Sequence, residues 1–321
     1  MRIAVVGCGA LGCFYGARLC QAGQDVHMLL RSGYEMVRNE GLRIDSVQGG
    51  LLVHPHAHDA PKDIGGCDLV VVGLKTTAND QFGKLITPLL DGDTAILCLQ
   101  NGLGNCEQLA DLFGRERLLG GLCFVCLNRI KPGVVRYIAF GKVILGEFGR
   151  SPSERTHTIA DIFKEAQVPC EVSGNLEKSQ WEKLVWNIPF NGLGVAGAAG
   201  LKALEGAGRN MPEELDPVMP TDKLLSDLRW EEWVRELMSE IIAAANAKGL
   251  GVDAGLKEQM VNYTRDMGEY RASTLVDFER GQPLEMESMF LEPLRQARAT
   301  GVAIPRLEAL CAVLEKLDAR S

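Results

Sequence analysis

Residues 1–12 read MRIAVVGCGALG, and they are the most informative part of the chain for its fold. Residues 2–6 are short and apolar, which predicts a buried β-strand. Residues 10–22 carry the apolar spacing of an α-helix, and glycines fill the turn between the two elements. A strand, a glycine-rich turn and a helix in this order are typical of the first unit of a parallel α/β sheet.

The turn itself follows the spacing G-x-G-x-x-G. Its first glycine permits a tight turn, the second lets the backbone approach a pyrophosphate, and the third lets the helix pack on the strand. Free N–H groups at the helix N-terminus favour an anion at the same place. The alternative is a strand–helix turn without a ligand. We expect a dinucleotide cofactor along the whole motif, which consists of Gly7, Cys8, Gly9, Ala10, Leu11 and Gly12.

Arg31 indicates which dinucleotide the chain prefers. A site for NAD carries Asp or Glu about 20 residues after the motif, where it holds the ribose 2′-hydroxyl. This chain has Leu29-Leu30-Arg31-Ser32 there, with no acid. A guanidinium pairs well with a 2′-phosphate, and Ser32 adds a hydroxyl. We therefore predict NADP(H); the alternative is an arginine solvated at the end of a strand.

The first half of the chain alternates strands and helices. Residues 25–30 predict a second strand, and the continuous apolar runs 68–74, 94–99 and 118–127 predict strands buried on both faces. Helical spacing fills the intervals, as in residues 105–113. This rhythm predicts a doubly wound, Rossmann-type parallel sheet, and residues 134–147 predict antiparallel strands that close its edge.

From about residue 177 onward the pattern is almost wholly helical. We predict two domains, residues 1–174 for NADP binding and an all-helical domain, residues 175–321, for substrate and catalysis. Residues 206–222 predict a mobile loop or insertion, because they are rich in Pro, Gly, Asp and Glu. The apolar faces that predict helices span 176–186, 230–247, 256–267, 285–299 and 307–317.

Composition excludes several classes of protein. The 321 residues carry a net charge of −8, which argues against a nucleic-acid partner. No apolar run reaches the ~18 residues of a membrane helix, and the N-terminus does not resemble a signal peptide, so we predict a cytoplasmic protein without membrane contacts. The oligomeric state stays open, with a homodimer as one alternative.

Cysteine and histidine usage does not point to a metal. The ten cysteines are scattered through apolar runs and are expected to be reduced and buried. Cys123 and Cys126 form a lone C-x-x-C without a second pair, which disfavours a redox or zinc role. His54, His56 and His58 lack an acidic or thiol partner at a defined spacing, so we expect a solvated loop or edge strand there and no metal site.

A polar stripe on the helix near residues 179–193 is the main catalytic candidate. Lys183, Asn187 and Asn191 lie four residues apart and share one face, beside several apolar residues. Such a stripe is costly to bury without partners, so it faces either solvent or a ligand. The spacing alone leaves both readings open. We expect Pro189 to distort this helix.

Two polar residues follow predicted strands, at the edge where open α/β sheets bind ligands. Lys75 follows the strand 68–74, and it supplies the local positive charge that an acidic chain needs for an anionic ligand. Asn101 belongs to QNGLG at 100–104 after the next strand. The alternative for this second segment is a simple Asn-Gly turn.

Together these motifs resemble those of the ketopantoate reductase (2-dehydropantoate 2-reductase) family. The resemblance covers most of the chain, and the K-x-x-x-N-x-x-x-N helix combined with the QNG turn is its specific part. The matching segments are GCGALG at 7–12, Arg31, LK at 74–75, QNGLG at 100–104, WEKLVWN and Asn191 within 181–191, and Ser273 with Glu285 twelve residues later in PLEME.

The resemblance implies an oxidoreductase of pantothenate biosynthesis that reduces ketopantoate, a small anionic 2-oxo acid, with NADPH. It implies that Lys183 is the general acid and Glu285 its carboxylate partner, with Glu287 ranked below. Asn101 would bridge cofactor and substrate, and Lys75 would lie beside the cofactor. The implied substrate contacts are Asn101, Lys183, Asn187, Asn191, Ser273 and Glu285.

The chain also departs from the family pattern. Where the family usually has Ser or Thr after N-x-L, this chain has Gly194, and the segment 204–228 replaces a short connection. Both changes lie in the predicted substrate domain, so they leave another small 2-oxo acid open as the substrate. A non-catalytic NADP(H)-sensing module is the other alternative, although a sensor does not need Lys183 and Glu285.

Overall fold

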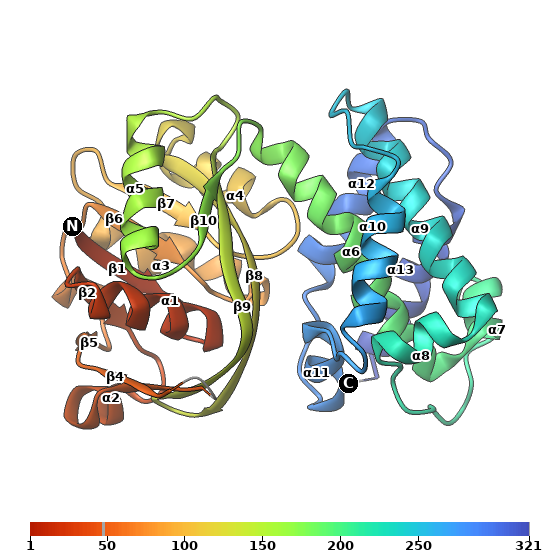
Figure 1. Cartoon of the computed structure of the whole chain (residues 1–321), viewed down its shortest axis with the longest axis horizontal. Helices are drawn as coiled ribbons and strands as arrows, with labels where there is room; N and C mark the ends of the chain where they lie inside the picture. The colour runs from red at the N-terminus through yellow and green to blue at the C-terminus, as the bar shows by residue number, and fades with distance from the viewer. Residues whose placement is uncertain (47–48, 321) are drawn as a thin grey trace. The chain divides into compact units, whose positions relative to one another are not determined.

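The computed structural model describes residues 1–46 and 49–320. The chain forms two compact units, Met1–Leu176 and Glu177–Ser321. The first unit contains a mixed sheet with helices on both faces, and the second is helical (Figure 1). The predicted fold class, a Rossmann-type α/β domain followed by a helical domain, is confirmed.

The sheet of the first unit runs in the order β4-β3-β9-β8-β7-β6-β1-β2-β5, and β10 pairs with β9. Neighbouring strands from β8 to β5 are parallel, as predicted. The long strands β8 and β9 are antiparallel, as predicted, but residues 134–147 form one strand that does not close the edge, because β3 and β4 lie beyond it. The strands are β1 Arg2–Val6, β2 Asp25–Leu29, β3 Leu42–Asp45, β4 Leu51–Val53, β5 His56–His58, β6 Leu69–Val72, β7 Ala95–Cys98, β8 Leu118–Lys131, β9 Val134–Glu147 and β10 Cys170–Val172.

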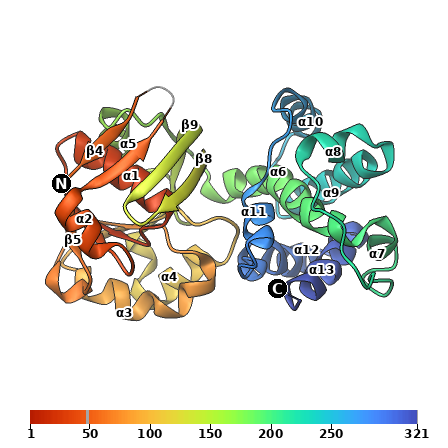
Figure 2. The same cartoon turned by 90° about the horizontal axis from the view of Figure 1, so that it is seen from below.

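Helices cover both faces of this sheet (Figure 2). Alternate residues of β1 point to opposite faces: Ile3 and Val5 pack in the core beneath α1 and α5, whereas Ala4 and Val6 pack in the core beneath α3 and α4. Burial on both faces explains why these strands read as continuous apolar runs. The helices of this unit are α1 Ala10–Gln21, α2 Tyr34–Glu40, α3 Phe82–Ile86, α4 Asn105–Phe113 and α5 Glu154–Glu165, with short 3₁₀ turns that include Thr76–Gln81.

Helix α6, Leu176–Ala196, supplies a large share of the core of the second unit, and nearly every residue of its last two turns is buried. A π-helical segment, Glu287–Leu291, precedes α12. The other helices are α7 Leu201–Glu205, α8 Thr221–Ser226, α9 Leu228–Ala247, α10 Leu256–Asp266, α11 Ser273–Glu279, α12 Glu292–Ala299 and α13 Pro305–Asp318.

Two helices differ from the sequence-based expectation. The spacing over 176–186 predicted a helix that α6 extends by ten residues, through Pro189, because tertiary packing holds the turns beyond the proline. The expected helix over 285–299 begins as the π segment instead. Such single-turn π segments are frequent at functional sites.

The segment 206–222 is irregular up to α8, as expected, and its backbone is bonded to the end of α6. The Asp216 N–H donates to the Ala198 carbonyl at 2.9 Å, and the Met219 N–H donates to the Gly194 carbonyl at 2.8 Å. The insertion therefore covers the C-terminal turns of the helix that carries the polar stripe.

All ten cysteines are free thiols. Burial raises the pKa of several of them, for example to about 12 for Cys13 and Cys170. Among the described residues, no helix combines the length and the apolar character needed to cross a membrane.

Candidate functional site

The glycine turn between β1 and α1 has the geometry of an anion site. Gly7 has φ +97°, a conformation that L side chains rarely adopt. The Gly9 N–H donates to the Gly7 carbonyl at 2.9 Å, and Gly9 is the N-cap of α1 without a side-chain cap. The first N–H groups of α1 therefore receive no cap from this residue, which is the arrangement that binds phosphates at helix N-termini.

The three glycines of the motif lack a side chain for different structural reasons. A Cβ atom on Gly7 would lie 2.2 Å from the Leu74 nitrogen, and one on Gly12 would lie 2.3 Å from the Gly7 carbonyl oxygen. Both positions are closed by neighbouring backbone. A Cβ on Gly9 would meet nothing within 4 Å, so the turn is open at the position where a pyrophosphate would approach the backbone.

Arg31 and Ser32 follow β2 after Leu30 and are exposed. Arg129, near the end of β8, donates from Nη2 to the Ser32 hydroxyl at 3.0 Å and to the Ser32 carbonyl at 3.2 Å. The Arg129 charge also acts on the Cys8 thiol within the glycine motif. The structure thus brings a second arginine to this end of the sheet. The sequence analysis missed it, because the contact joins residues 97 positions apart.

Lys75 and Asn101 follow β6 and β7, and an amide network joins their loops. The Gln100 side chain donates to the Leu74 carbonyl at 3.0 Å and to Asn79 Oδ1 at 2.8 Å. The Asn105 side chain donates to the Asn101 carbonyl at 2.9 Å. Gln100 and Asn105 therefore hold the two strand ends that carry the candidate residues.

In the second unit, the polar stripe of α6 becomes more buried along the helix. Lys183 is half-buried, Asn187 is 7% exposed and Asn191 is 2% exposed. Because the two asparagines are buried, the purely solvent-facing reading of the stripe is wrong for them. Polar groups at this depth need hydrogen-bond partners.

Asn191 finds its partners at the start of α11. Its Oδ1 accepts from the Thr274 N–H at 3.1 Å and lies 3.4 Å from the Ser273 hydroxyl oxygen. Its Nδ2 donates to the Asn187 carbonyl at 3.0 Å. Asn191 thus caps α11, which has no cap of its own, and positions Ser273. The structure brings together three of the predicted substrate contacts.

The two acidic residues of PLEME differ in environment. Glu285 is half-buried and lies just before the π segment, where its carbonyl accepts from the Met289 N–H at 3.1 Å. Glu287 is exposed and forms an ion pair with Arg295. The pairing of Glu287 with an exposed arginine leaves Glu285 as the better candidate of the two.

Gly194, where the chain departs from the family pattern, and the nearby Gly192 are sites of close packing. A Cβ on Gly192 would lie 2.6 Å from a Leu310 methyl carbon of α13. A Cβ on Gly194 would lie 2.4 Å from a Leu275 methyl carbon of α11. Leu275 thus fills the space that a side chain at 194 would need.

Two family models match the chain: "Ketopantoate reductase PanE/ApbA" over residues 3–150 and "Ketopantoate reductase PanE/ApbA C terminal" over residues 218–318. A 2-dehydropantoate 2-reductase of Nostoc sp. is 36% identical over 326 residues, which cover 100% of this chain and 96% of the relative.

Two solved structures are similarly close. The 2-dehydropantoate 2-reductase of Geobacter metallireducens is 43% identical with a TM-score of 0.88, covering 98% of this chain and 99% of its own. The one from Methylococcus capsulatus is 32% identical with a TM-score of 0.87, covering 100% and 97%. These matches extend over both units, and the chain therefore belongs to the ketopantoate reductase family of oxidoreductases.

Proposed function

We propose that this protein reduces 2-dehydropantoate to pantoate with NADPH. The relatives named 2-dehydropantoate 2-reductase match over the full length of the chain. The observation that carries the proposal is the stripe of α6, where a half-buried lysine and two buried asparagines lead to Ser273 at the start of α11.

The first unit offers the groups that would hold the cofactor. The open space over Gly9 and the first N–H groups of α1 fit a pyrophosphate. Arg31, Ser32 and Arg129 fit a ribose 2′-phosphate, because a guanidinium binds phosphate oxygens in fork geometry. Lys75 and Asn101 would lie toward the nicotinamide. When bound, NADPH supplies the hydride that the carbonyl carbon of the substrate gains.

The second unit supplies the proton. Lys183 donates it from Nζ to the carbonyl oxygen, which becomes the hydroxyl oxygen of the product, and solvent then reprotonates the lysine. A lysine is cationic at neutral pH, since its ordinary pKa is ~10.4. Glu285 accepts a hydrogen bond from the substrate and orients it for this transfer. Both roles follow the family resemblance.

The remaining polar groups position the substrate. Ser273 and Asn187 offer a hydroxyl and an amide for the carboxylate and hydroxyl oxygens of a 2-oxo acid. Asn191 acts mainly through Ser273, since its own side chain caps α11.

The absence of a membrane-spanning helix among the described residues and the free thiols fit an enzyme of the cytoplasm.

The test is NADPH oxidation, followed by absorbance, with 2-dehydropantoate and a panel of other small 2-oxo acids. Lys183→Ala should lower kcat by ~10²–10⁴, the usual contribution of a positioned proton donor, while NADPH still binds. Lys178→Ala is the matched control, because Lys178 lies on the same helix and pairs with the Gly251 carbonyl and Glu182 near the surface.

Two outcomes would contradict the proposal. Tight NADPH binding without oxidation by any 2-oxo acid would indicate a sensing module. A Lys183→Ala variant that keeps more than about a tenth of the wild-type kcat would remove the lysine from the chemistry.

A further inference from the structure

A cluster of histidines lies at the edge of the sheet in the first unit. Strand β5 ends the sheet and pairs in parallel with β2, which places His56 beside His27 and His58 beside Leu29. Asp25 lies two residues before His27, so all four polar side chains are on one face. The short H-x-H-x-H sequence lacked an acidic partner, and the fold supplies one from a strand about 30 residues away.

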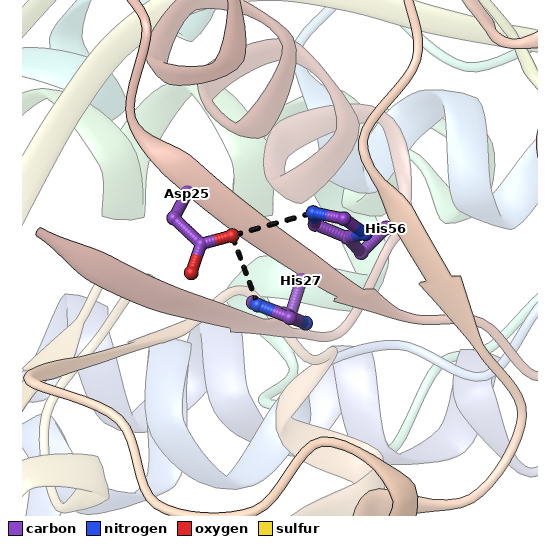
Figure 3. Close-up of side chains that lie close together, drawn as sticks. All are labelled: Asp25, His27 and His56. Carbon is purple, nitrogen blue, oxygen red and sulfur yellow. Dashed lines mark ion pairs between the residues drawn. The ribbon is translucent and has the colours of Figure 1, made fainter.

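The ring nitrogens of this cluster converge on one carboxylate oxygen (Figure 3). Asp25 Oδ1 lies 3.1 Å from His27 Nε2 and 3.4 Å from His56 Nε2. The three atoms lie within 4.8 Å of one another. Two imidazoles and a carboxylate are a ligand set typical of zinc and related divalent ions.

His27 is the buried member of the set. Only 5% of its surface is exposed, and its Nε2 atom has no hydrogen-bond partner of good geometry among the described residues, even though Asp25 Oδ1 is near. A buried polar atom without such a partner is unusual in folded proteins. A metal ion between Nε2 and Oδ1 would satisfy it.

His58 orients His27 from the other side. His27 Nδ1 lies 3.0 Å from His58 Nε2. In the tautomer that donates from His27 Nδ1 to His58, the lone pair of His27 Nε2 points toward Asp25. Histidines that bind metals usually donate their other ring N–H to an acceptor such as a carboxylate, a carbonyl or water, which fixes the ring, and His58 Nε2 would be that acceptor here.

The charges around the cluster leave one carboxylate oxygen for a cation. Arg2 Nη1 lies 3.3 Å from Asp25 Oδ2, the oxygen that faces away from the rings.

We infer that Asp25, His27 and His56 form a binding site for one divalent transition-metal ion, with Zn²⁺ as the representative. Zn–N and Zn–O bonds of about 2.0–2.1 Å set tetrahedral edges of about 3.3 Å, close to the two distances from Asp25 Oδ1. The His56 side chain is 65% exposed, and its ring stacks on that of His27 with the centroids 4.7 Å apart, so this ring would have to turn to close the third edge. The fourth position is left for water.

This site does not depend on the proposed reductase activity. Asp25 begins β2, whereas Arg31 follows the opposite end of the same strand. The cluster uses none of the residues assigned to the cofactor or the substrate.

The experiment is a calorimetric titration of Zn²⁺ into the chelator-treated full-length protein at neutral pH, in the presence of a weak reductant. We expect one Zn²⁺ per chain, and an affinity at least ~100-fold lower in His56→Ala and in Asp25→Asn, since even outer partners of metal ligands contribute 10–100-fold. His157→Ala is the matched control, because His157 is an exposed histidine of α5 outside the cluster. NADPH oxidation in metal-free buffer should be the same in all variants, which shows that they fold.

Equal Zn²⁺ affinity in the wild type and His56→Ala would overturn the proposal, and so would a wild type that binds no Zn²⁺. Loss of binding in His157→Ala comparable to that in His56→Ala would overturn it as well. A thermal shift by Zn²⁺ in the wild type that is missing in His56→Ala would support it independently, since a ligand that binds only the folded state raises stability.

Discussion

At the scale of single residues, Arg129 adds a second arginine to the predicted binding site for the cofactor's 2′-phosphate. The sequence predicted Arg31 and Ser32 as the groups for a 2′-phosphate, and the structure adds Arg129, which reaches Ser32 from β8. The two arginines come from strands that the sheet order separates by several positions. The contact of Arg129 with Ser32 depends on the tertiary fold, so spacing in the sequence gives no sign of it.

We predict that Arg31→Ala lowers the preference for NADPH over NADH by roughly 10- to 150-fold, because a charge-assisted hydrogen bond contributes ~1.5–3 kcal/mol. Arg129→Ala should lower it in the same direction. The ratio of kcat/KM for the two cofactors is the measurement. Arg43→Ala, which removes an exposed arginine paired with Asp45 on β3, is the control and should leave the ratio unchanged. A wild type that uses NADH as well as NADPH would refute the assignment of Arg31.

The two glutamates of PLEME allow a second comparison at this scale. Glu285→Ala should lower kcat and raise KM for the 2-oxo acid together, with NADPH affinity close to normal, because its half-buried carboxylate is assigned to the substrate. Glu287→Ala removes an exposed ion pair with Arg295, which contributes ~1 kcal/mol or less to stability, and should leave the kinetics unchanged. If the two effects are exchanged, the catalytic carboxylate is Glu287.

At the scale of elements, variants of the glycine turn can distinguish an effect on NADPH binding from an effect on the stability of the fold. Gly9→Ala should keep the stability of the protein but weaken NADPH binding by ~10-fold or more, since the added methyl enters open space that a pyrophosphate needs. Fluorescence titration with NADPH measures the affinity, and thermal melting measures stability.

Two further variants complete this test. Gly83→Ala on α3 also points into open space and should affect neither property adversely, whereas Gly12→Ala should destabilise the fold through contact with the Gly7 carbonyl. Normal NADPH affinity in Gly9→Ala would place the cofactor elsewhere.

Periodicity predicted the elements whose structure is local or uniformly buried. The strand 2–6 has the expected limits, because an apolar run identifies it, whereas the span 134–147, predicted as antiparallel strands, is the single strand β9. The short edge strand His56–His58 was one of the two alternatives predicted there, the other being a solvated loop. Strands of three or four residues such as β4 and β10 were missed, since their pattern is too short to show a period.

The sequence named the candidate site residues but predicted only some of the contacts among them. Spacing placed Lys183, Asn187 and Asn191 on one helix face. The capping of α11 by Asn191 joins residues 83 positions apart, and nothing in either segment alone indicates it. Pro189 was expected to distort α6, and the helix continues through it to Ala196, because packing on both sides of the helix outweighs the lost hydrogen bond.

At the scale of the whole molecule, Glu147 is a buried charge that the sequence did not single out. It ends β9, is 1% exposed, and accepts from Arg155 at 2.7 and 2.9 Å. Burial raises the pKa of Glu147, but the hydrogen bonds from Arg155, Thr156, Ser153 and Arg150 outweigh burial and lower it to about 2.

This shift predicts how the first unit responds to acid. The stabilisation by Glu147 is complete above its unfolded pKa, near 4.3, and is lost as pH falls toward about 2. The free energy of unfolding should fall by on the order of 3 kcal/mol over this range. Denaturant unfolding at several pH values measures it. Glu147→Gln should be less stable at pH 7 and show a flatter pH dependence; equal slopes would contradict the assignment.

The contact between Leu275 and Gly194 constrains the order in which mutations can accumulate. If Gly194→Ser occurs first, the serine clashes with the Leu275 methyl groups and is destabilising; it becomes tolerable only once residue 275 is smaller. If residue 275 becomes smaller first, a void opens beside Gly194, which costs about 2–5 kcal/mol for Leu→Ala in a core. The two positions are therefore epistatic, and a lineage can cross between the glycine and serine forms mainly through a smaller intermediate such as valine at 275.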